Sequence, residues 1–353
     1  MRGQGLFHGR IFVATRVNGF AETLAMIKIA QLGAGRMGGV HARNAAANLR
    51  LDLAFVVDPK PQAAQALAAE VGARPASFEA VLADPSILGV VIASSTAVHL
   101  ENTLACLAAG KAVFCEKPLD LDPRRLESAK AQLTAPAARL FVAFNRRFDH
   151  QFRTLKARLA AGDVGILETL HIVSHDPAPP PPAFIPTSGG LFKDFTIHDF
   201  DTARWLLGEE PREVFAFAGC LVDPAIGAAG DVDTAKILLR TPTDRLVVIS
   251  NTRRSGYGYD QRVEAFGAGG RLAVDNIRLS TVDLWREAGA LAEPIQPGFM
   301  TRYAQAYRDE MDHFADILED GSAPLTGYDD SLAALVLAEA AGRSVQTGAP
   351  VRL

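Results

Sequence analysis

The chain has 353 residues, of which 48% are hydrophobic and 22% charged, and its formal net charge is −4. This length favours two domains, and the charge gives no support for a nucleic acid or an anionic membrane as partner. No apolar run approaches the roughly 18 residues of a membrane helix. The three cysteines form no CxxC pair and no metal spacing, which fits a reducing, cytoplasmic compartment.

The first 25 residues differ in pattern from the rest of the chain. Their apolar run, "IFVA", is shorter than the roughly 7 to 15 residues of a signal-peptide core. A second methionine, Met26, opens "MIKIAQLGAG", which is typical of a first strand. We therefore expect residues 1–25 to be an extension outside the fold, dispensable for folding and activity.

From Met26 onward, strands alternate with helices. Apolar segments typical of strands begin near residues 27, 51, 89 and 112, and alanine-rich helical segments lie between them; the second helix ends at Gly72, a plausible C-terminal cap. This alternation predicts a parallel sheet with helices on both faces.

The first strand ends in "GAGRMG", residues 33–38, a GxGxxG turn that opens a helix. Glycines there allow a tight turn and close approach of a pyrophosphate. Asp58 ends the second strand, where an acid accepts hydrogen bonds from the ribose hydroxyls and repels a 2′-phosphate. The alternative is a plain glycine-rich turn with a helix-capping aspartate. The pattern favours NAD as the cofactor over NADP.

Lys117 lies in "FCEKP", at the C-terminal end of a predicted parallel strand. Ligands of such sheets bind at this edge, so a functional lysine is favoured over a surface lysine before a turn. The following Pro118 keeps the lysine in extended backbone.

After "LFVAFNRRFD" the alternation breaks, and consecutive strands with short turns indicate an antiparallel sheet. Two strands join at "TPTD", and "QRVEAFGAGGRLAVDN" predicts a hairpin. The proline-rich segment 175–190 is expected to be extended and partly stiff. It is either a connector or a wall of the active site.

Residues 191–207 predict a mostly apolar, buried helix with Asp194, His198, Asp201 and Trp205 on one face. A carboxylate one turn from an imidazole can fix its tautomer and favour its protonated form, as in general-base catalysis. Alternatively, Asp194 is only a favourable charge at a helix N-terminus and His198 a satisfied core residue. A metal site of Asp194, His198 and Asp201 is disfavoured, because no further His or Cys cluster has ligand spacing.

"GAGRMG", Asp58, "AAGKAVFCEKPLD" and "FNRRFD" together resemble the Gfo/Idh/MocA family of glucose–fructose oxidoreductases, inositol dehydrogenases and rhizopine-catabolism proteins. The resemblance runs from Met26 to the C-terminus. It implies an α/β fold with an N-terminal NAD-binding Rossmann domain, residues 26–145. It also implies a C-terminal α+β domain for substrate binding and oligomerisation, residues 146–353, with an open, mostly antiparallel sheet.

The resemblance also implies site residues. "KDFTIHDFD" and "SGYGYDQRVEAFG" look closest to inositol dehydrogenases, which makes Lys117, Asp194 and His198 catalytic and implies no metal. The cofactor contacts it implies are Gly33, Gly35, Arg36, Met37, Gly38, Asp58, Ser94, Ser95, Thr96, His99, Glu116 and Lys117. The polyol contacts it implies are Asn145, Arg146, Asp176, Asp194, His198, Tyr257 and Tyr259.

The implied activity is NAD-dependent oxidation of a cyclic polyol, myo-inositol at C2, to a ketone, by a homo-oligomer that is a tetramer or a dimer. Dehydrogenation of another inositol isomer or a sugar is the alternative. A non-catalytic nucleotide-sensing regulator is a further one, against which the joint presence of Lys117, Asp194 and His198 argues. Because an ordinary imidazole titrates near pH 6.5, activity is expected to rise through neutral pH as His198 deprotonates.

Overall fold

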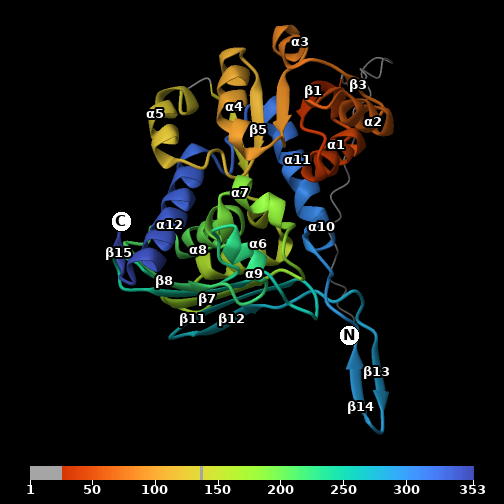
Figure 1. Ribbon diagram of the computed structural model, residues 1–353. Coiled ribbons are helices and arrows are strands. Elements are labelled where there is room, and N and C mark those ends of the chain that lie inside the picture. The colour runs from red at the N-terminus through yellow and green to blue at the C-terminus, as the bar shows by residue number, and fades with distance from the viewer. Residues whose placement is uncertain (1–25, 136–137) are drawn as a thin grey trace, which may run out of the picture.

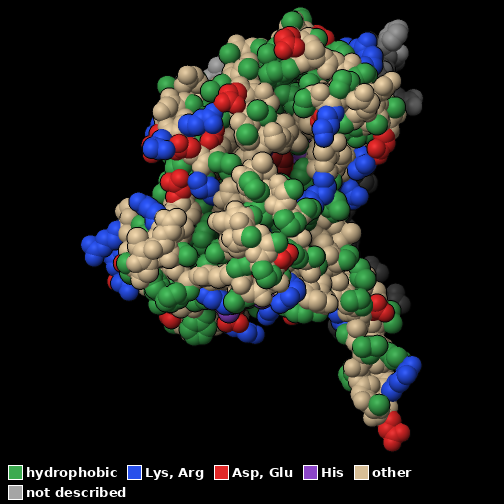
Figure 2. Space-filling model, in the orientation of Figure 1, with side chains coloured by type: hydrophobic (Ala, Val, Ile, Leu, Met, Phe, Trp, Pro, Cys, Tyr) green, Lys and Arg blue, Asp and Glu red, His purple; other side chains and the backbone are tan. Residues whose placement is uncertain are grey.

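The structure is a computed structural model that describes residues 26–135 and 138–353. The expectation for residues 1–25 falls outside these residues. Two sheets, each covered by helices, form the upper and lower halves of the molecule (Figure 1). The region where the two halves adjoin, which includes Lys117 of the upper half and Asp194 of the lower half, is called the waist below. In the space-filling view, charged side chains of both signs gather at this waist (Figure 2).

The upper sheet has six strands in the order β3-β2-β1-β4-β5-β6, and all its neighbouring strands are parallel. Its inner strands are apolar runs buried on both faces, as the helices on either side require. The predicted parallel sheet is therefore confirmed. Its strands are β1 (Ile27–Leu32), β2 (Leu51–Val57), β3 (Arg74–Pro75), β4 (Gly89–Ile92), β5 (Ala112–Glu116) and β6 (Leu140–Ala143).

The helices of this half include one from the far end of the chain, α11 (Ala304–Glu319). Its Phe314 stacks edge-on against Phe114 of β5 at 5.8 Å. A Cβ on Gly89 would lie 2.8 Å from the ring of Phe314, so the glycine allows α11 to approach the sheet closely. A boundary near residue 145 thus separates the two sheets but not their helices. The other helices here are α1 (Arg36–Ala47), α2 (Pro61–Val71), α3 (Phe78–Ala83), α4 (His99–Ala108) and α5 (Pro123–Leu133).

The lower sheet has seven strands in the order β12-β11-β7-β10-β9-β8-β15. Only β7 and β10 pair in parallel, so the sheet is mostly antiparallel as predicted. One face is covered by α6 (His150–Ala160), α8 (Ile197–Leu207) and α12 (Tyr328–Thr347), and the other is open (Figure 1). Its strands are β7 (Leu167–His175), β8 (Glu213–Gly219), β9 (Thr234–Arg240), β10 (Leu246–Thr252), β11 (Asp260–Gly267), β12 (Gly270–Val274) and β15 (Val351–Arg352).

Shorter elements complete the fold. The proline-rich segment contains two helical turns, η3 (Pro182–Phe184) and α7 (Ile185–Ser188), so the expectation of an extended segment was only partly right. A hairpin projects from the body in Figures 1 and 2. Its strands are β13 (Asp283–Arg286) and β14 (Gly289–Ala292), and the remaining short helices are η1 (Thr96–Val98), η2 (Asn145–Phe148), η4 (Leu191–Thr196), α9 (Pro224–Ala228) and α10 (Phe299–Arg302).

Candidate active site

The glycine turn after β1 is packed so tightly that two of its glycines are obligatory. Gly33 has a φ of +95°, and a Cβ there would lie 2.3 Å from the Ala93 carbonyl oxygen. A Cβ on Gly38 would lie 2.0 Å from the Gly33 carbonyl oxygen. A Cβ on Gly35 would meet nothing within 4 Å, so this glycine faces open space.

That open space fits the pyrophosphate of a dinucleotide. Gly35 is the N-cap of α1, with no side-chain cap and no acidic residue in the first turn. The N–H groups of the first turn of α1 and the positive end of the helix dipole therefore remain for an anion. The open space and the free donors together match the group that the sequence predicts.

Asp58 braces the same turn. One of its carboxylate oxygens accepts a hydrogen bond from the Ala34 N–H at 2.8 Å, and the other accepts one from the Lys60 N–H at 2.8 Å. The carboxylate is thus fixed at the end of β2, beside the turn. A carboxylate oxygen has lone pairs beyond a single bond, so this placement leaves capacity for ribose hydroxyls.

The segment from the end of β4 to the start of α4 carries four of the predicted cofactor residues, Ser94, Ser95, Thr96 and His99. The Ser94 hydroxyl is buried and without a partner among the described residues, so a donor or acceptor from a ligand would satisfy it. The His99 ring bonds the carbonyl of Pro118 at 2.9 Å and lies 3.2 Å from that of Ser94. A neutral imidazole has one N–H, so His99 braces this loop against the Glu-Lys-Pro segment.

Glu116, a predicted cofactor contact, is buried at the end of β5. Its carboxylate bonds the His41 ring at 2.7 Å and accepts from the Lys117 N–H at 3.2 Å. Burial raises the pKa of Glu116, but the hydrogen bond and charge of His41, together with the charges of Lys117 and His99, lower the pKa below its ordinary value. Glu116 therefore anchors the backbone of Lys117, and its contact with the cofactor stays a prediction.

Lys117 crosses the waist from the end of β5. Its ammonium group donates to the backbone carbonyl of Asp194 at 2.6 Å and lies 3.5 Å from the Asp194 carboxylate. Two of the three predicted catalytic residues, from opposite halves of the molecule, are thus in contact. Asp194 also lies 3.7 Å from Nη2 of Arg253.

The segment carrying Asp194 is not the continuous α-helix that the sequence predicts. Residues 191–196 form a π-helical turn, η4, and regular α-helix begins only at Ile197. Such turns are frequent at functional sites. Among the described residues no hydrogen bond joins the two side chains.

The pKa of His198 is therefore set by its burial and by charges other than that of Asp194. Desolvation, followed by the charges of Lys117 and Arg146, lowers its pKa well below 6.5. The expectation that a carboxylate would favour the protonated imidazole was wrong, because burial, and after it the charges of Lys117 and Arg146, disfavour that form. The ring is consequently neutral at neutral pH, and its Nδ1 is buried without a partner among the described residues.

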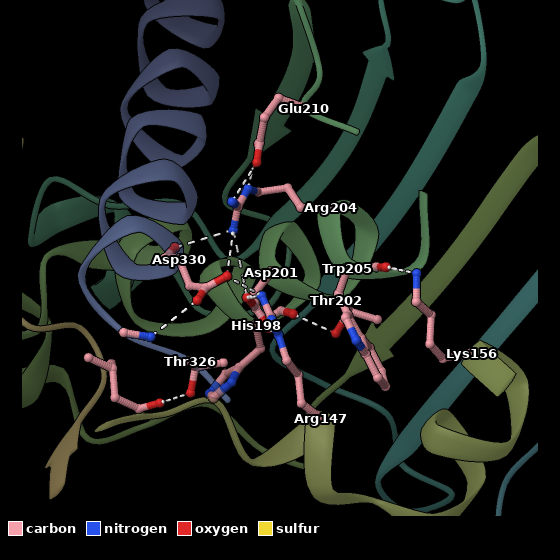
Figure 3. Close-up of polar contacts among 12 residues, drawn as sticks. Arg147, Lys156, His198, Asp201, Thr202, Arg204, Trp205, Glu210, Thr326 and Asp330 are labelled. Atoms are coloured by element: carbon pink, nitrogen blue, oxygen red, sulfur yellow. Dashed lines mark hydrogen bonds and ion pairs between the residues drawn. The ribbon is translucent and has the colours of Figure 1, made fainter. Parts of the chain in front are cut away.

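The lower part of the predicted stripe, Asp201 and Trp205, belongs to a structural network (Figure 3). Asp201 accepts two hydrogen bonds from Arg147, at 2.6 and 3.0 Å, and Arg147 also bonds Asp330 of α12 at 2.6 Å. The backbone carbonyl of Trp205 accepts from Lys156 at 2.6 Å. These bonds join α8, η2, α6 and α12, and the described residues contain no cluster suited to a metal ion.

Arg146 and its neighbour Asn145 are both buried in η2. Arg146 forms a buried ion pair with Asp199, and Asp199 also accepts from Ser174 at 2.5 Å and from Asn251 at 2.8 Å. Asp199 was not among the residues predicted from the sequence, although a buried carboxylate next to His198 in an apolar helix was a signal for it. Arg146 thus acts on the site mainly as a fixed positive charge.

The two predicted tyrosines lie in different places. Tyr259 is buried, its ring stands 6.0 Å from that of Tyr303, and Arg146 and Asp176 lie near enough to affect its pKa. Tyr257 is exposed and its hydroxyl donates to Asp260 at 2.7 Å, beside His175. The structure therefore brings Tyr259, but not Tyr257, to the remaining polyol contacts.

Asp176 and Arg253 stand side by side, because the Asp176 N–H donates to the carbonyl of Thr252 at 2.9 Å. Burial raises the pKa of Asp176 to about 7, with Arg253 opposing and Asp194 adding to the rise. Arg253, only 2% exposed, was not predicted from the sequence. Its signal was a pair of arginines at the end of a predicted buried strand.

Comparisons with known proteins agree with this geometry. Residues 27–144 match an oxidoreductase family with an NAD-binding Rossmann fold, and residues 152–273 match the Gfo/Idh/MocA C-terminal domain. The chain is 42% identical to an inositol 2-dehydrogenase of Rhizobium meliloti, over 90% of this chain and 97% of that protein.

Two solved structures extend the likeness. A myo-inositol dehydrogenase from Corynebacterium glutamicum is 40% identical, with a TM-score of 0.88 over 93% of this chain and 99% of that one. A scyllo-inositol dehydrogenase from Lactobacillus casei, with bound NAD(H) and scyllo-inositol, is 28% identical, with a TM-score of 0.85 over 93% of this chain and 99% of that one. The fold and the site thus define an NAD-binding oxidoreductase. The chain belongs to the Gfo/Idh/MocA family.

Proposed function

We propose that this protein oxidises a ring hydroxyl of an inositol to a ketone, with myo-inositol at C2 as the substrate. The observation that carries the proposal is the meeting of Lys117, Asp194 and a neutral His198 at the waist, next to a dinucleotide turn. Relatives named for myo- and scyllo-inositol support the choice of substrate.

The roles follow from the charges. A secondary alcohol gives up hydride readily only as its proton leaves, so a base must accept that proton. The neutral imidazole of His198 accepts it through its unprotonated nitrogen. The ammonium group of Lys117, beside Asp194, stabilises the negative charge that develops on the substrate oxygen. NAD, held by the turn and by Asp58, supplies the hydride acceptor.

The test is NADH formation by the purified protein with a panel of inositol isomers and sugars. We expect myo-inositol to give the highest kcat/KM, and His198→Ala to lower kcat by about 10² to 10⁴, the usual worth of general-base catalysis. His150→Ala, at an exposed position at the start of α6, is the matched control and should leave kcat unchanged. A different preferred isomer would overturn the substrate, and a loss below threefold in kcat would remove His198 as the base.

We also infer that copies of this chain assemble through the open face of the lower sheet. Leu238 of β9 and Val248 of β10 are paired neighbours there, 50% and 36% exposed, and Phe217 of β8 is 67% exposed. Exposed apolar side chains grouped on one face of a sheet are typical of an interface. No described helix is long and apolar enough to cross a bilayer. Leu238→Glu should lower the mass measured by analytical ultracentrifugation, and an unchanged mass would contradict the assembly.

A further inference from the structure

Arg253 is a buried cation to which the proposed chemistry assigns no role. It follows β10 and is anchored by its backbone N–H, which donates to the Asp233 carbonyl at 2.9 Å. One face of its guanidinium lies over the ring of Phe195, 5.9 Å from the centroid. Its Nε and Nη2 are buried and without hydrogen-bond partners among the described residues.

The unsatisfied edge is the one that arginines of this chain use to grip two oxygens at once. Nε and Nη2 of Arg147 bind both oxygens of Asp201, at 3.0 and 2.6 Å. The same edge of Arg204 binds Glu210 at 2.6 and 2.6 Å. Bidentate recognition is the particular strength of the planar guanidinium. An edge of this type, buried beside the catalytic residues and without hydrogen bonds among the described residues, matches a ligand with two adjacent acceptor oxygens.

The charges around Arg253 decide the class of that ligand. Asp194 lies 3.7 Å from Nη2, and Asp176 is close enough for its pKa to be affected by Arg253. A ligand carboxylate would be repelled by these acids. Hydroxyl groups avoid this conflict, because each can accept from the guanidinium and donate to a carboxylate.

We propose that Arg253 is a specificity-determining residue that binds two adjacent hydroxyls of the substrate ring through its Nε–Nη2 edge, while Asp176 and Asp194 accept hydrogen bonds from those hydroxyls. This inference rests on the proposed polyol oxidation. Arg253 would then recognise hydroxyls that do not react, while Lys117 and His198 act on the hydroxyl that is oxidised. A ring that lacks one of the two hydroxyls leaves the buried donors unpaired, and such sites discriminate strongly.

The experiment compares inositol with the series of monodeoxyinositols, in the wild type and in Arg253→Lys and Arg253→Gln. In the wild type, loss of a gripped hydroxyl should lower kcat/KM at least about tenfold. Lysine keeps the positive charge but not the planar guanidinium with its two parallel N–H donors. Both variants should therefore raise KM for inositol about tenfold or more, alter kcat less, and no longer distinguish inositol from that deoxy analogue. Arg254→Lys, at an exposed neighbouring position, is the matched control.

Melting temperature and NAD affinity, measured by quenching of protein fluorescence, check that the variants are folded. A KM within twofold of the wild type, or unchanged discrimination among the deoxy analogues, overturns the inference. If neither variant folds, the wild type decides alone, because equal kcat/KM for every monodeoxyinositol excludes a buried two-hydroxyl grip. A preference of the wild type for sugar acids over neutral polyols also overturns it.

The inference and the proposed function can fail separately. If the wild type oxidises another polyol and not inositol, the proposed substrate is wrong. The same comparison is then made with that polyol and its deoxy forms. Dependence of its KM on Arg253 would support the inference, and independence would overturn it.

Discussion

The ammonium group of Lys117 donates to the backbone carbonyl of Asp194 at 2.6 Å, nearer than to the carboxylate at 3.5 Å. The bond joins the end of β5 in the upper half to the π-helical turn η4 in the lower half. A hydrogen bond to the backbone holds the position of Lys117 while the Asp194 carboxylate stays available to a ligand. This one hydrogen bond therefore fixes the ammonium group of Lys117, from the upper half, against the turn of the lower half that carries Asp194.

Replacement of Lys117 by alanine is expected to lower kcat by about 10² to 10³, the usual loss when a donor to a developing oxyanion is removed. NAD affinity should survive, because the glycine turn and Asp58 lie elsewhere. Removing this charge should also raise the pKa of His198 and move the acid limb of kcat to higher pH. Lys193→Ala is the control, since Lys193 also crosses the waist, to the Leu121 carbonyl at 2.6 Å. An unmoved acid limb would show that Lys117 does not face His198 in solution.

The pH profile should show two ionisations. The base form of His198 is gained as pH rises through its pKa, which desolvation and two cations lower, so the acid limb of kcat should lie below pH 6.5. In the free enzyme Asp176, with a pKa of about 7, should add a limb to kcat/KM, because its ionised form is the better acceptor for substrate hydroxyls. Asp176→Asn should abolish only this second limb. Persistence of a limb near 7 in that variant would assign it to another group.

Asp58 should set the choice between NAD and NADP. Its carboxylate is held beside the glycine turn, where it repels a 2′-phosphate, so kcat/KM should be higher with NAD. Asp58→Ala should reduce the difference between the kcat/KM values measured with NAD and with NADP. Asp58→Asn, which keeps an acceptor but loses the charge, separates repulsion from bracing of the turn. An NADP preference of the wild type would exclude this role.

Asp201 should matter for stability and not for chemistry. It is 1% exposed and paired with Arg147, and removing one partner of a buried ion pair typically costs about 3–5 kcal/mol. Asp201→Asn should therefore lower the free energy of unfolding by an amount of this order, measured by urea denaturation. At a temperature where the variant is folded, kcat should be within about threefold of the wild type. Glu70→Gln, in the exposed pair with Arg43, is the control and should change stability little. A large fall in kcat with unchanged stability would return Asp201 to the catalytic site.

The sequence alone determined the class of fold, because its evidence is local. The alternation of apolar strands with helices predicts a parallel sheet, and the glycine pattern of residues 33–38 marks the turn after its first strand. The position of Lys117 at a strand end also follows from local pattern. Each of these features depends on neighbours in the chain or on a general rule of parallel sheets.

Only the tertiary structure decided which charges meet. The spacing of Asp194 and His198 predicted a pair, but no hydrogen bond joins them among the described residues. Burial, followed by the charges of Lys117 and Arg146 from two other elements, lowers the pKa of His198. Arg253 reaches Asp194 across 59 residues of sequence, a separation that no periodicity encodes. The protonation state of His198 and the contacts of the Arg253 guanidinium depend on burial and on distances between groups, which are defined only in the folded protein.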